Sequence, residues 1–199
     1  MSCFPLCVEM KGKRVFLAGC GKFAEEKLEK LLTFEAEIVL FAEAGFDDLC
    51  HPQVSLVRRK LQDSYLDSLP LFVVAAEQER EENRRISESC RQRNIPVNVV
   101  DDPELCSFYF PALIRRGEAC ISISSGGKSP VASALLRQRL EQAVPQNLEE
   151  ILDWSAALRL TLKERIADPQ QRKIILRNAV ALAMAEDRIP TLDEIEKMA

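Results

Sequence analysis

Three short stretches of this 199-residue chain carry residue types and spacings that could do chemistry. The first is GCGKFA (19–24), in which Gly19, Gly21 and Ala24 match the G-x-G-x-x-G/A pattern of dinucleotide-binding loops. In such loops the first glycine allows a tight turn, the second lets the backbone approach a pyrophosphate, and the small third residue lets a helix pack on a strand. The pattern predicts dinucleotide binding, and a plain tight turn is the alternative.

The second stretch is ISISSGGKSP (121–130), whose GGKS is similar to the end of a phosphate-binding P-loop. A P-loop needs a further glycine where this chain has Ser122, so the motif is incomplete. An apolar alternation over residues 119–123 instead predicts a strand that enters a turn, with Ser129 and Pro130 as N-cap and first residue of a helix. The unpaired N–H groups of a helix start suit an anion.

The third stretch is VNVVD (97–101), where Asp101 closes an apolar run that reads as a strand. Open α/β sheets bind their ligands at the carboxyl ends of strands, which makes Asp101 the candidate reactive carboxylate. Asp102 precedes a proline and is typical of a turn. Asn98 has two interpretations, either orienting a substrate group or donating a hydrogen bond to the backbone at the strand end.

The elements that must position these residues alternate along the chain. We expect strands in the apolar runs at 14–19, 37–42, 54–57, 71–76 and 97–100. We expect helices at 22–34, from the spacing of its apolar residues, and in the charged stretch 79–93. Such alternation indicates a parallel α/β sheet with covered faces. After about residue 145 the pattern is helical only, which predicts a boundary near Pro145.

Composition excludes several classes of protein. The formal charge of −4 argues against general nucleic-acid binding. The seven cysteines lack C-x-x-C pairing and there is a single histidine, so we expect free, mostly buried thiols and no metal site. The sequence has no apolar run of membrane-spanning length and no signal-peptide pattern at its start, which predicts a soluble, cytoplasmic protein without membrane contact.

Taken together, three stretches resemble one family, the precorrin-2 dehydrogenase and sirohydrochlorin ferrochelatase module of siroheme synthesis. They are AGCGKFAEEKLEKLL (18–32), VNVVDDPELCSFYFPALIRRG (97–117) and ISISSGGKSPVASALLRQRLE (121–141). The resemblance covers roughly residues 4–145. It implies an NAD-binding Rossmann domain at 1–112, a dimerisation and tetrapyrrole-binding region at 113–145, a small helical domain at 146–199, and a homodimer.

The resemblance also implies an activity: NAD-dependent oxidation of precorrin-2 to sirohydrochlorin, with Fe²⁺ (or Co²⁺) insertion as a further step. The family's catalytic aspartate corresponds to Asp101, which would act as a base in both reactions. The implied cofactor-binding residues are Gly19, Cys20, Gly21, Lys22, Phe23, Ala24, Glu43, Ala76 and Glu77. The implied substrate-binding residues are Asn98, Ser124, Ser125, Gly126, Gly127 and Lys128.

The chain departs from the family pattern at two cofactor positions. Phe23 replaces a valine and is expected to enlarge the contact of the helix with the sheet. Glu77 replaces a threonine facing the cofactor crevice, where a carboxylate either repels the pyrophosphate or grips a ribose hydroxyl. Glu43 lies where the ribose-binding acid of NAD enzymes is expected, and the alternative is an exposed glutamate at a helix start.

Positive charge for an anionic substrate is available from Lys128, Arg115, Arg116 and Arg137, although a solvated surface role explains each of these as well. Two other functions stay open. In the first, the protein inserts a metal ion but does not oxidise precorrin-2, because Glu77 prevents NAD binding. The other is a non-enzymatic NAD(H)-sensing or scaffolding Rossmann dimer, which needs the glycine fingerprint but neither Asp101 nor the SSGG turn.

Overall fold

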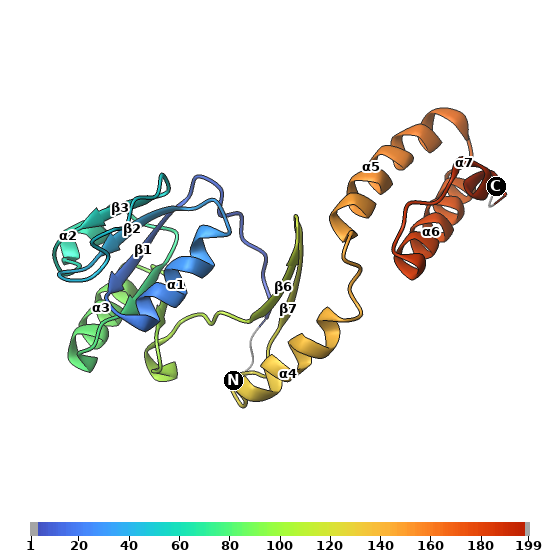
Figure 1. Cartoon of the computed structure of the whole chain (residues 1–199). Coiled ribbons are helices and arrows are strands. Elements are labelled where there is room, and N and C mark those ends of the chain that lie inside the picture. Colours follow the sequence, from blue (N-terminus) through green and yellow to red (C-terminus); the bar gives the residue numbers. More distant parts are fainter. Residues whose placement is uncertain (1–3, 198–199) are drawn as a thin grey trace. The chain divides into compact units, whose positions relative to one another are not determined.

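The computed structural model describes residues 4–197 of the chain (Figure 1). It divides into two compact units, one formed by Phe4–Phe110 and one that begins at Pro111. The further division of the second unit at residue 145 stays a prediction.

The first unit is built on a five-stranded parallel sheet in the order β3-β2-β1-β4-β5. The strands are β1 (Arg14–Gly19), β2 (Glu37–Phe41), β3 (Val54–Val57), β4 (Val73–Ala76) and β5 (Val97–Val99). The sheet order reverses between β1 and β4, and open α/β sheets bind their ligands at the carboxyl ends of the strands at such a reversal. The expected Rossmann-like α/β fold is confirmed.

Helices cover both faces of this sheet (Figure 1). They are α1 (Lys22–Leu32), α2 (Asp63–Leu66), α3 (Arg80–Gln92) and the short 3₁₀ helix η1 (Pro103–Leu105). The buried residues of α1 belong to the apolar cluster on one face, and the buried apolar residues of α2 and α3 belong to the cluster on the other. Strands β1, β4 and β5 therefore bury both of their side-chain rows, as their continuous apolar sequences require, whereas the edge strand β3 is only partly buried and exposes Ser55.

Phe23 corrects one sequence-based expectation. Its side chain is 51% exposed, whereas its neighbour Ala24 is fully buried. The helical spacing places Ala24, Leu28 and Leu31 on the buried stripe of α1, and Phe23 falls outside that stripe. Phe23 therefore does not enlarge the contact between helix and sheet.

The second unit contains an antiparallel hairpin followed by helices. Its elements are β6 (Ala112–Arg116), β7 (Ala119–Ile123), α4 (Pro130–Glu141), α5 (Leu148–Arg165), α6 (Pro169–Glu186) and α7 (Leu192–Glu196). The predicted helix start is confirmed, because the Ala132 N–H donates to the Ser129 hydroxyl at 3.1 Å and Pro130 is the first helical residue. Helices α5 and α6 pack through a small apolar cluster around Leu158, Leu162 and Ile175.

The cysteines correct a second expectation. Those in the described part of the chain are free, but only Cys90 is buried among them, and Cys7, Cys50 and Cys120 are exposed. Burial raises the pKa of the Cys90 thiol to about 12. Within residues 4–197 we find no cluster of three or more metal-ligating side chains, and no helix long and apolar enough to cross a membrane.

Candidate functional site

The loop between β1 and α1 has the backbone that its glycines predict. Gly19 has φ +123°, and a Cβ there would lie 2.1 Å from the carbonyl oxygen of Ala76. Gly21 has φ +79°, caps α1 without a side-chain hydrogen bond, and would have open space around a Cβ. The loop thus offers a bare helix start with room for a ligand, which fits a dinucleotide pyrophosphate.

The other cofactor residues flank this loop. Cys20 is partly buried, Lys22 is exposed and forms an ion pair with Glu26 at 3.9 Å, and Phe23 is exposed. Ala76 is 5% exposed and pairs with Gly19 in the register of β4 and β1.

Glu77 follows β4 and is only partly exposed. Its backbone N–H donates to the side-chain oxygen of Asn83 at 3.0 Å, and its carbonyl accepts from the Asn83 amide at 2.9 Å. Burial raises the pKa of the Glu77 carboxyl, and the negative charges of Glu82 and Glu43 raise it further against the opposing effect of Lys60. A carboxyl held beside other acids resists ionisation, and when ionised it repels an approaching anion.

Glu43 is exposed in a loop that begins after β2. No helix follows this glutamate, because the next element is β3, so the helix-start alternative is wrong. The negative charge of Glu43 raises the pKa of Glu77. The two carboxyl groups, which follow the carboxyl ends of β2 and β4, therefore interact electrostatically. The assignment of Glu43 as a ribose ligand stays a prediction.

Asp101 lies in the turn after β5, with an exposed side chain and φ +57°. Aspartate tolerates this left-handed conformation better than most residues. The neighbouring Asp102 has the expected turn role and forms an ion pair with Arg80 at 2.8 Å. The turn therefore fixes Asp102 inward and leaves the Asp101 carboxylate accessible.

The Cys106 side chain ties this turn to β5. Its sulfur accepts from the Val99 N–H at 3.1 Å, and its thiol donates to the Val99 carbonyl at 3.2 Å. Burial is the largest cause that raises the pKa of Cys106, which keeps the thiol protonated and able to donate.

Asn98 is 6% exposed, and its amide donates to the carbonyl of Phe108 at 3.1 Å. The interpretation of Asn98 as a donor to the backbone therefore accounts for its side-chain NH₂ group but not for its side-chain oxygen. Its Oδ1 atom is buried without a hydrogen-bond partner in the described part of the chain. A buried acceptor left unpaired is costly, and a substrate N–H could satisfy it.

In the SSGG turn of the second unit, the serine hydroxyls form hydrogen bonds within the turn and to a residue that follows it. The Ser125 hydroxyl donates to the Ser129 carbonyl at 3.0 Å and accepts from the Ser129 N–H at 3.1 Å. The Gly126 N–H donates to the Ser124 hydroxyl at 3.2 Å. Gly127, at φ +77°, has open space around it. The serines thus shape the turn, and its exposed backbone is the part left for a ligand.

The positive residues of this unit differ in their availability. Arg116 and Arg137 both form ion pairs with Glu141, at 3.6 and 2.6 Å. Arg115 donates to the Gly117 carbonyl at 2.9 Å. Lys128 is exposed, and no ion pair joins it to another residue of the described chain. Lys128 is therefore the cation of this set best suited to meet a substrate carboxylate.

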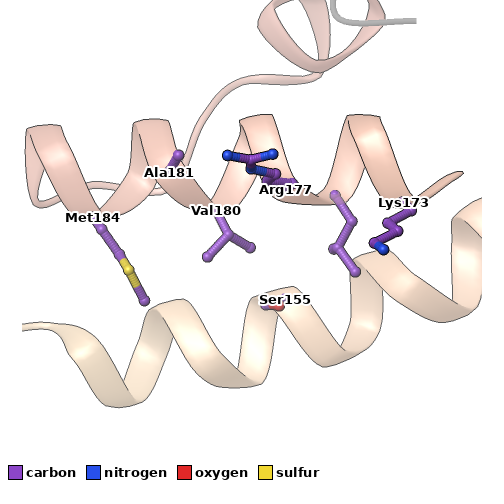
Figure 2. A pocket seen from close by; sticks show the side chains of 7 residues that line it. Ser155, Lys173, Arg177, Val180, Ala181 and Met184 are labelled. Atoms are coloured by element: carbon purple, nitrogen blue, oxygen red, sulfur yellow. The ribbon is translucent and has the colours of Figure 1, made fainter. Parts of the chain in front are cut away.

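A groove of about 440 Å³ lies between α5 and α6. Its lining residues are Ser155, Lys173, Leu176, Arg177, Val180, Ala181 and Met184. Figure 2 shows Val180 and Met184 pointing from one helix toward the other, where Ser155 lies. The lining holds no carboxylate, thiol or imidazole and no residue that the sequence singled out for chemistry, and its charged side chains are the cations Lys173 and Arg177.

Sequence reasoning missed two residues of the first unit that contact the candidate site. Asn83 holds the backbone of Glu77, and Lys27 interacts electrostatically with Asp101. Both lie inside charged helical stretches; Lys27 interacts with a residue far away in sequence, and Asn83 bonds the backbone six residues before it. The one signal available in the sequence was the position of Lys27, a charged residue on the apolar face of its helix.

Comparison with known proteins adds further evidence. Residues 6–112 match the family described as "Putative NAD(P)-binding", and residues 121–143 match the family described as "Sirohaem biosynthesis protein central". The siroheme synthase of Thioalkalivibrio sulfidiphilus is 33% identical over 177 residues, which cover 87% of this chain and 36% of that protein. Siroheme synthase 1 of Klebsiella pneumoniae is 34% identical over 177 residues, which cover 87% of this chain and 37% of that protein.

The chain spans about two fifths of the length of the curated relatives it matches. Among solved structures, "SirC, precorrin-2 dehydrogenase" superposes with a TM-score of 0.70 at 18% identity, covering 98% of this chain and 100% of that one. This structural likeness supports the fold.

Proposed function

Because this chain belongs to the NAD(P)-binding family matched by residues 6–112 and is related to siroheme synthases, we propose that it oxidises precorrin-2 to sirohydrochlorin with NAD. The observation that carries the proposal is one edge of the sheet with two features: a bare helix start beside Gly19 and Gly21, and the accessible carboxylate of Asp101 after the end of β5. Parallel strands place both at the same edge of the sheet.

Each group has a defined task in this proposal. The N–H groups at the start of α1 bind the pyrophosphate, and Glu43 accepts from a ribose hydroxyl, which favours NAD over NADP. Bound NAD supplies a hydride acceptor. Precorrin-2 gives up a hydride and a proton, and the Asp101 carboxylate takes the proton. Asn98 Oδ1 accepts from a pyrrole N–H. In the second unit, the turn from Ser124 to Lys128 has the exposed backbone and the cation that suit a carboxylate, as the family resemblance implies.

The test is an anaerobic assay in which precorrin-2 is generated in situ and NADH and sirohydrochlorin absorbance are followed. Wild-type protein should show NAD-dependent turnover, and Asp101→Asn should lower kcat by roughly 10² to 10⁴ because the amide cannot accept the proton. Asp102→Asn is the matched control, since that side chain is engaged by Arg80. Turnover of Asp101→Asn at the wild-type rate would exclude Asp101 as the base.

A second candidate function is chelation of Fe²⁺ or Co²⁺ by the same site. Glu77 favours it, because a half-buried acid among other acids opposes a dinucleotide at the cofactor edge. Metal insertion requires two pyrrole protons to leave, and Asp101 would again be the base. Calorimetry separates the two candidates: tight NAD binding by the wild type supports oxidation, and no binding leaves chelation.

The same family relationship supports a homodimer, a cytoplasmic location and a tetrapyrrole as the small-molecule partner. A purely NAD(H)-sensing dimer is the third candidate. It predicts NAD binding with no turnover of precorrin-2 and no metallation of sirohydrochlorin, which the same assays measure.

A further inference from the structure

Arg58 lies where two neighbouring strands of the parallel sheet end. It is the first residue after β3, whose last residue Val57 pairs with Phe41, the last residue of β2. The Val57 carbonyl also accepts from the Ala42 N–H at 3.1 Å. Arg58 therefore stands beside the point at which the loop that carries Glu43 leaves the sheet.

The Arg58 guanidinium contacts three consecutive residues of this loop. It donates to the carbonyl oxygens of Gly45 and Phe46, the second at 3.4 Å. It also forms an ion pair with the Asp47 carboxylate, with 2.9 Å between Nη2 and Oδ1. A planar guanidinium has several donors at fixed angles, so that one side chain can bind all three acceptors. Arg58 thus fixes the backbone of the loop.

The loop has a backbone conformation that must be held in place. Gly45 has φ +74° and Phe46 has φ +57°. Glycine adopts this left-handed conformation freely, but a bulky aromatic residue rarely does. Such residues persist where surrounding contacts hold them, and they occur often at ligand-binding sites. At Phe46 these contacts are the hydrogen bonds that its carbonyl accepts from Arg58 and from the Leu49 N–H, and the packing of its side chain on the apolar cluster beneath α1.

The same loop lies against the glycine fingerprint. A Cβ on Gly45 would lie 4.0 Å from the Cβ of Cys20, which is an ordinary van der Waals contact. Cys20 is the middle residue of the GCG turn (19–21) that precedes α1. Arg58 therefore holds a loop that carries Glu43 and borders the turn proposed to bind the pyrophosphate.

We propose that Arg58 is a positioning residue for the adenosine half of NAD and acts through Glu43. This inference rests on the cofactor part of the proposed function, in which Glu43 accepts from the ribose 2′-hydroxyl. Within the described part of the chain, no hydrogen bond or ion pair holds the Glu43 carboxylate. Its position depends on the backbone of the loop, which Arg58 fixes from Gly45 onward. Ordering the loop in advance reduces the entropy that is lost when ribose binds.

The experiment measures by calorimetry the affinity for NAD and for ADP-ribose, which has the adenosine half but no nicotinamide. Arg58→Met should raise both Kd values by roughly fivefold to tenfold. Arg58→Lys should show most of the same loss, since an ammonium keeps the charge but lacks the fork that reaches three acceptors. Arg59→Met removes the same charge from the neighbouring exposed side chain, and this control should bind both ligands as the wild type does.

A double-mutant cycle tests whether Arg58 acts through Glu43. Glu43→Gln alone should weaken NAD binding by roughly tenfold, because an amide oxygen is a poorer acceptor than a carboxylate. When Arg58→Met is added, Kd should stay near that of the single variants instead of rising by roughly a further tenfold. In turnover, Arg58→Met should raise KM for NAD and leave kcat at saturating NAD unchanged.

Three results would overturn the inference while leaving the proposed function intact. They are an unchanged affinity of Arg58→Met for ADP-ribose, an equal loss in Arg59→Met, and additive effects of the Arg58 and Glu43 changes. Thermal unfolding of each variant shows whether the fold is retained. A wild type that binds NAD and ADP-ribose but does not turn over precorrin-2 would overturn the proposed oxidation and not the role of Arg58 in binding. A folded wild type that binds neither ligand would overturn both.

Discussion

At the scale of single residues, we expect Glu77 to influence how readily the proposed cofactor site accepts an anion. Its carboxyl is partly buried beside Glu82 and Glu43, and its backbone is fixed by Asn83. Because the pKa of Glu77 is raised, the carboxyl is neutral over a wider acidic range than an ordinary glutamate. Repulsion of a pyrophosphate is therefore absent at low pH and develops as the pH rises through that raised pKa.

We predict that NAD binds the wild type more weakly as the pH rises from 5 to 8, and that Glu77→Gln removes most of this dependence. At pH 8 the variant should bind NAD roughly threefold to tenfold more tightly, because one nearby negative charge is lost. Calorimetry at several pH values measures both effects. Glu88→Gln, an exposed change on α3, is the control, and a weaker affinity in Glu77→Gln would show instead that the carboxylate grips a ribose hydroxyl.

The sequence predicted the residues whose role depends on backbone geometry. Gly19 and Ala24 could be identified because the glycine fingerprint requires a tight turn at the first position and a small buried residue at the last. Both requirements are met in the structure. Phe23 was misjudged because its outward direction depends on the phase of α1, which the motif leaves open. Lys27 was missed because its interaction with Asp101 joins segments distant in sequence, and Asn83 was missed because no local pattern marks it among the polar residues of its helix.

At the scale of elements, β5 and the segment after it form one unit. Val99 exchanges hydrogen bonds with the side chain of Cys106, and Val97 does so with Ser107, whose hydroxyl accepts from the Val97 N–H at 2.8 Å. These side chains lock the turn that carries Asp101 onto the end of the strand.

We predict that Cys106→Ala selectively loosens this attachment. The Val99 amide should exchange its hydrogen roughly fivefold faster, because a buried hydrogen bond contributes about 1 kcal/mol. The Val97 amide, held by Ser107, should exchange at the wild-type rate. Amide exchange followed by NMR measures both, Cys120→Ala on the exposed face of β7 is the control, and equal acceleration of both amides would point to general destabilisation.

The five strands of the sheet were predictable because each is a short, mainly apolar run, although the edge strand β3 is only partly buried. Strand β6 was missed, since its sequence ALIRR ends in two arginines, one of which is exposed. Helix α7 was missed as well, although its capping box of Thr191 and Glu194 is a sequence signal. Short elements depend on tertiary packing, which local patterns do not contain.

At the scale of the whole molecule, α4 leaves apolar side chains in water. Its exposed large apolar residues are Val131, Leu135, Leu136 and Leu140. The helix packs on the β6–β7 hairpin through a face that includes the buried Ser133. An apolar surface of this kind suits a second copy of the chain, as the expected dimerisation region 113–145 requires.

We predict that light scattering will give twice the chain mass of 22.5 kDa for the wild type, and the single mass for Leu135→Glu. A charge in the centre of a dimer interface costs several kcal/mol when it is buried without a partner. Leu160→Glu, at a 65% exposed position of α5, is the control and should remain dimeric. A monomeric wild type at working concentration would remove the homodimer from the proposal.

The side chains of Cys106 and Ser107 have one more consequence. Because β5 is the last strand of the sheet, its outward N–H and C=O groups at Val97 and Val99 would otherwise be open to a strand from another molecule. The thiol and the hydroxyl occupy those groups, so the border of the sheet is closed without a sixth strand. Oxidation of Cys106 would reopen half of that border, and stored protein should then form β-rich aggregates that a thiol reductant prevents.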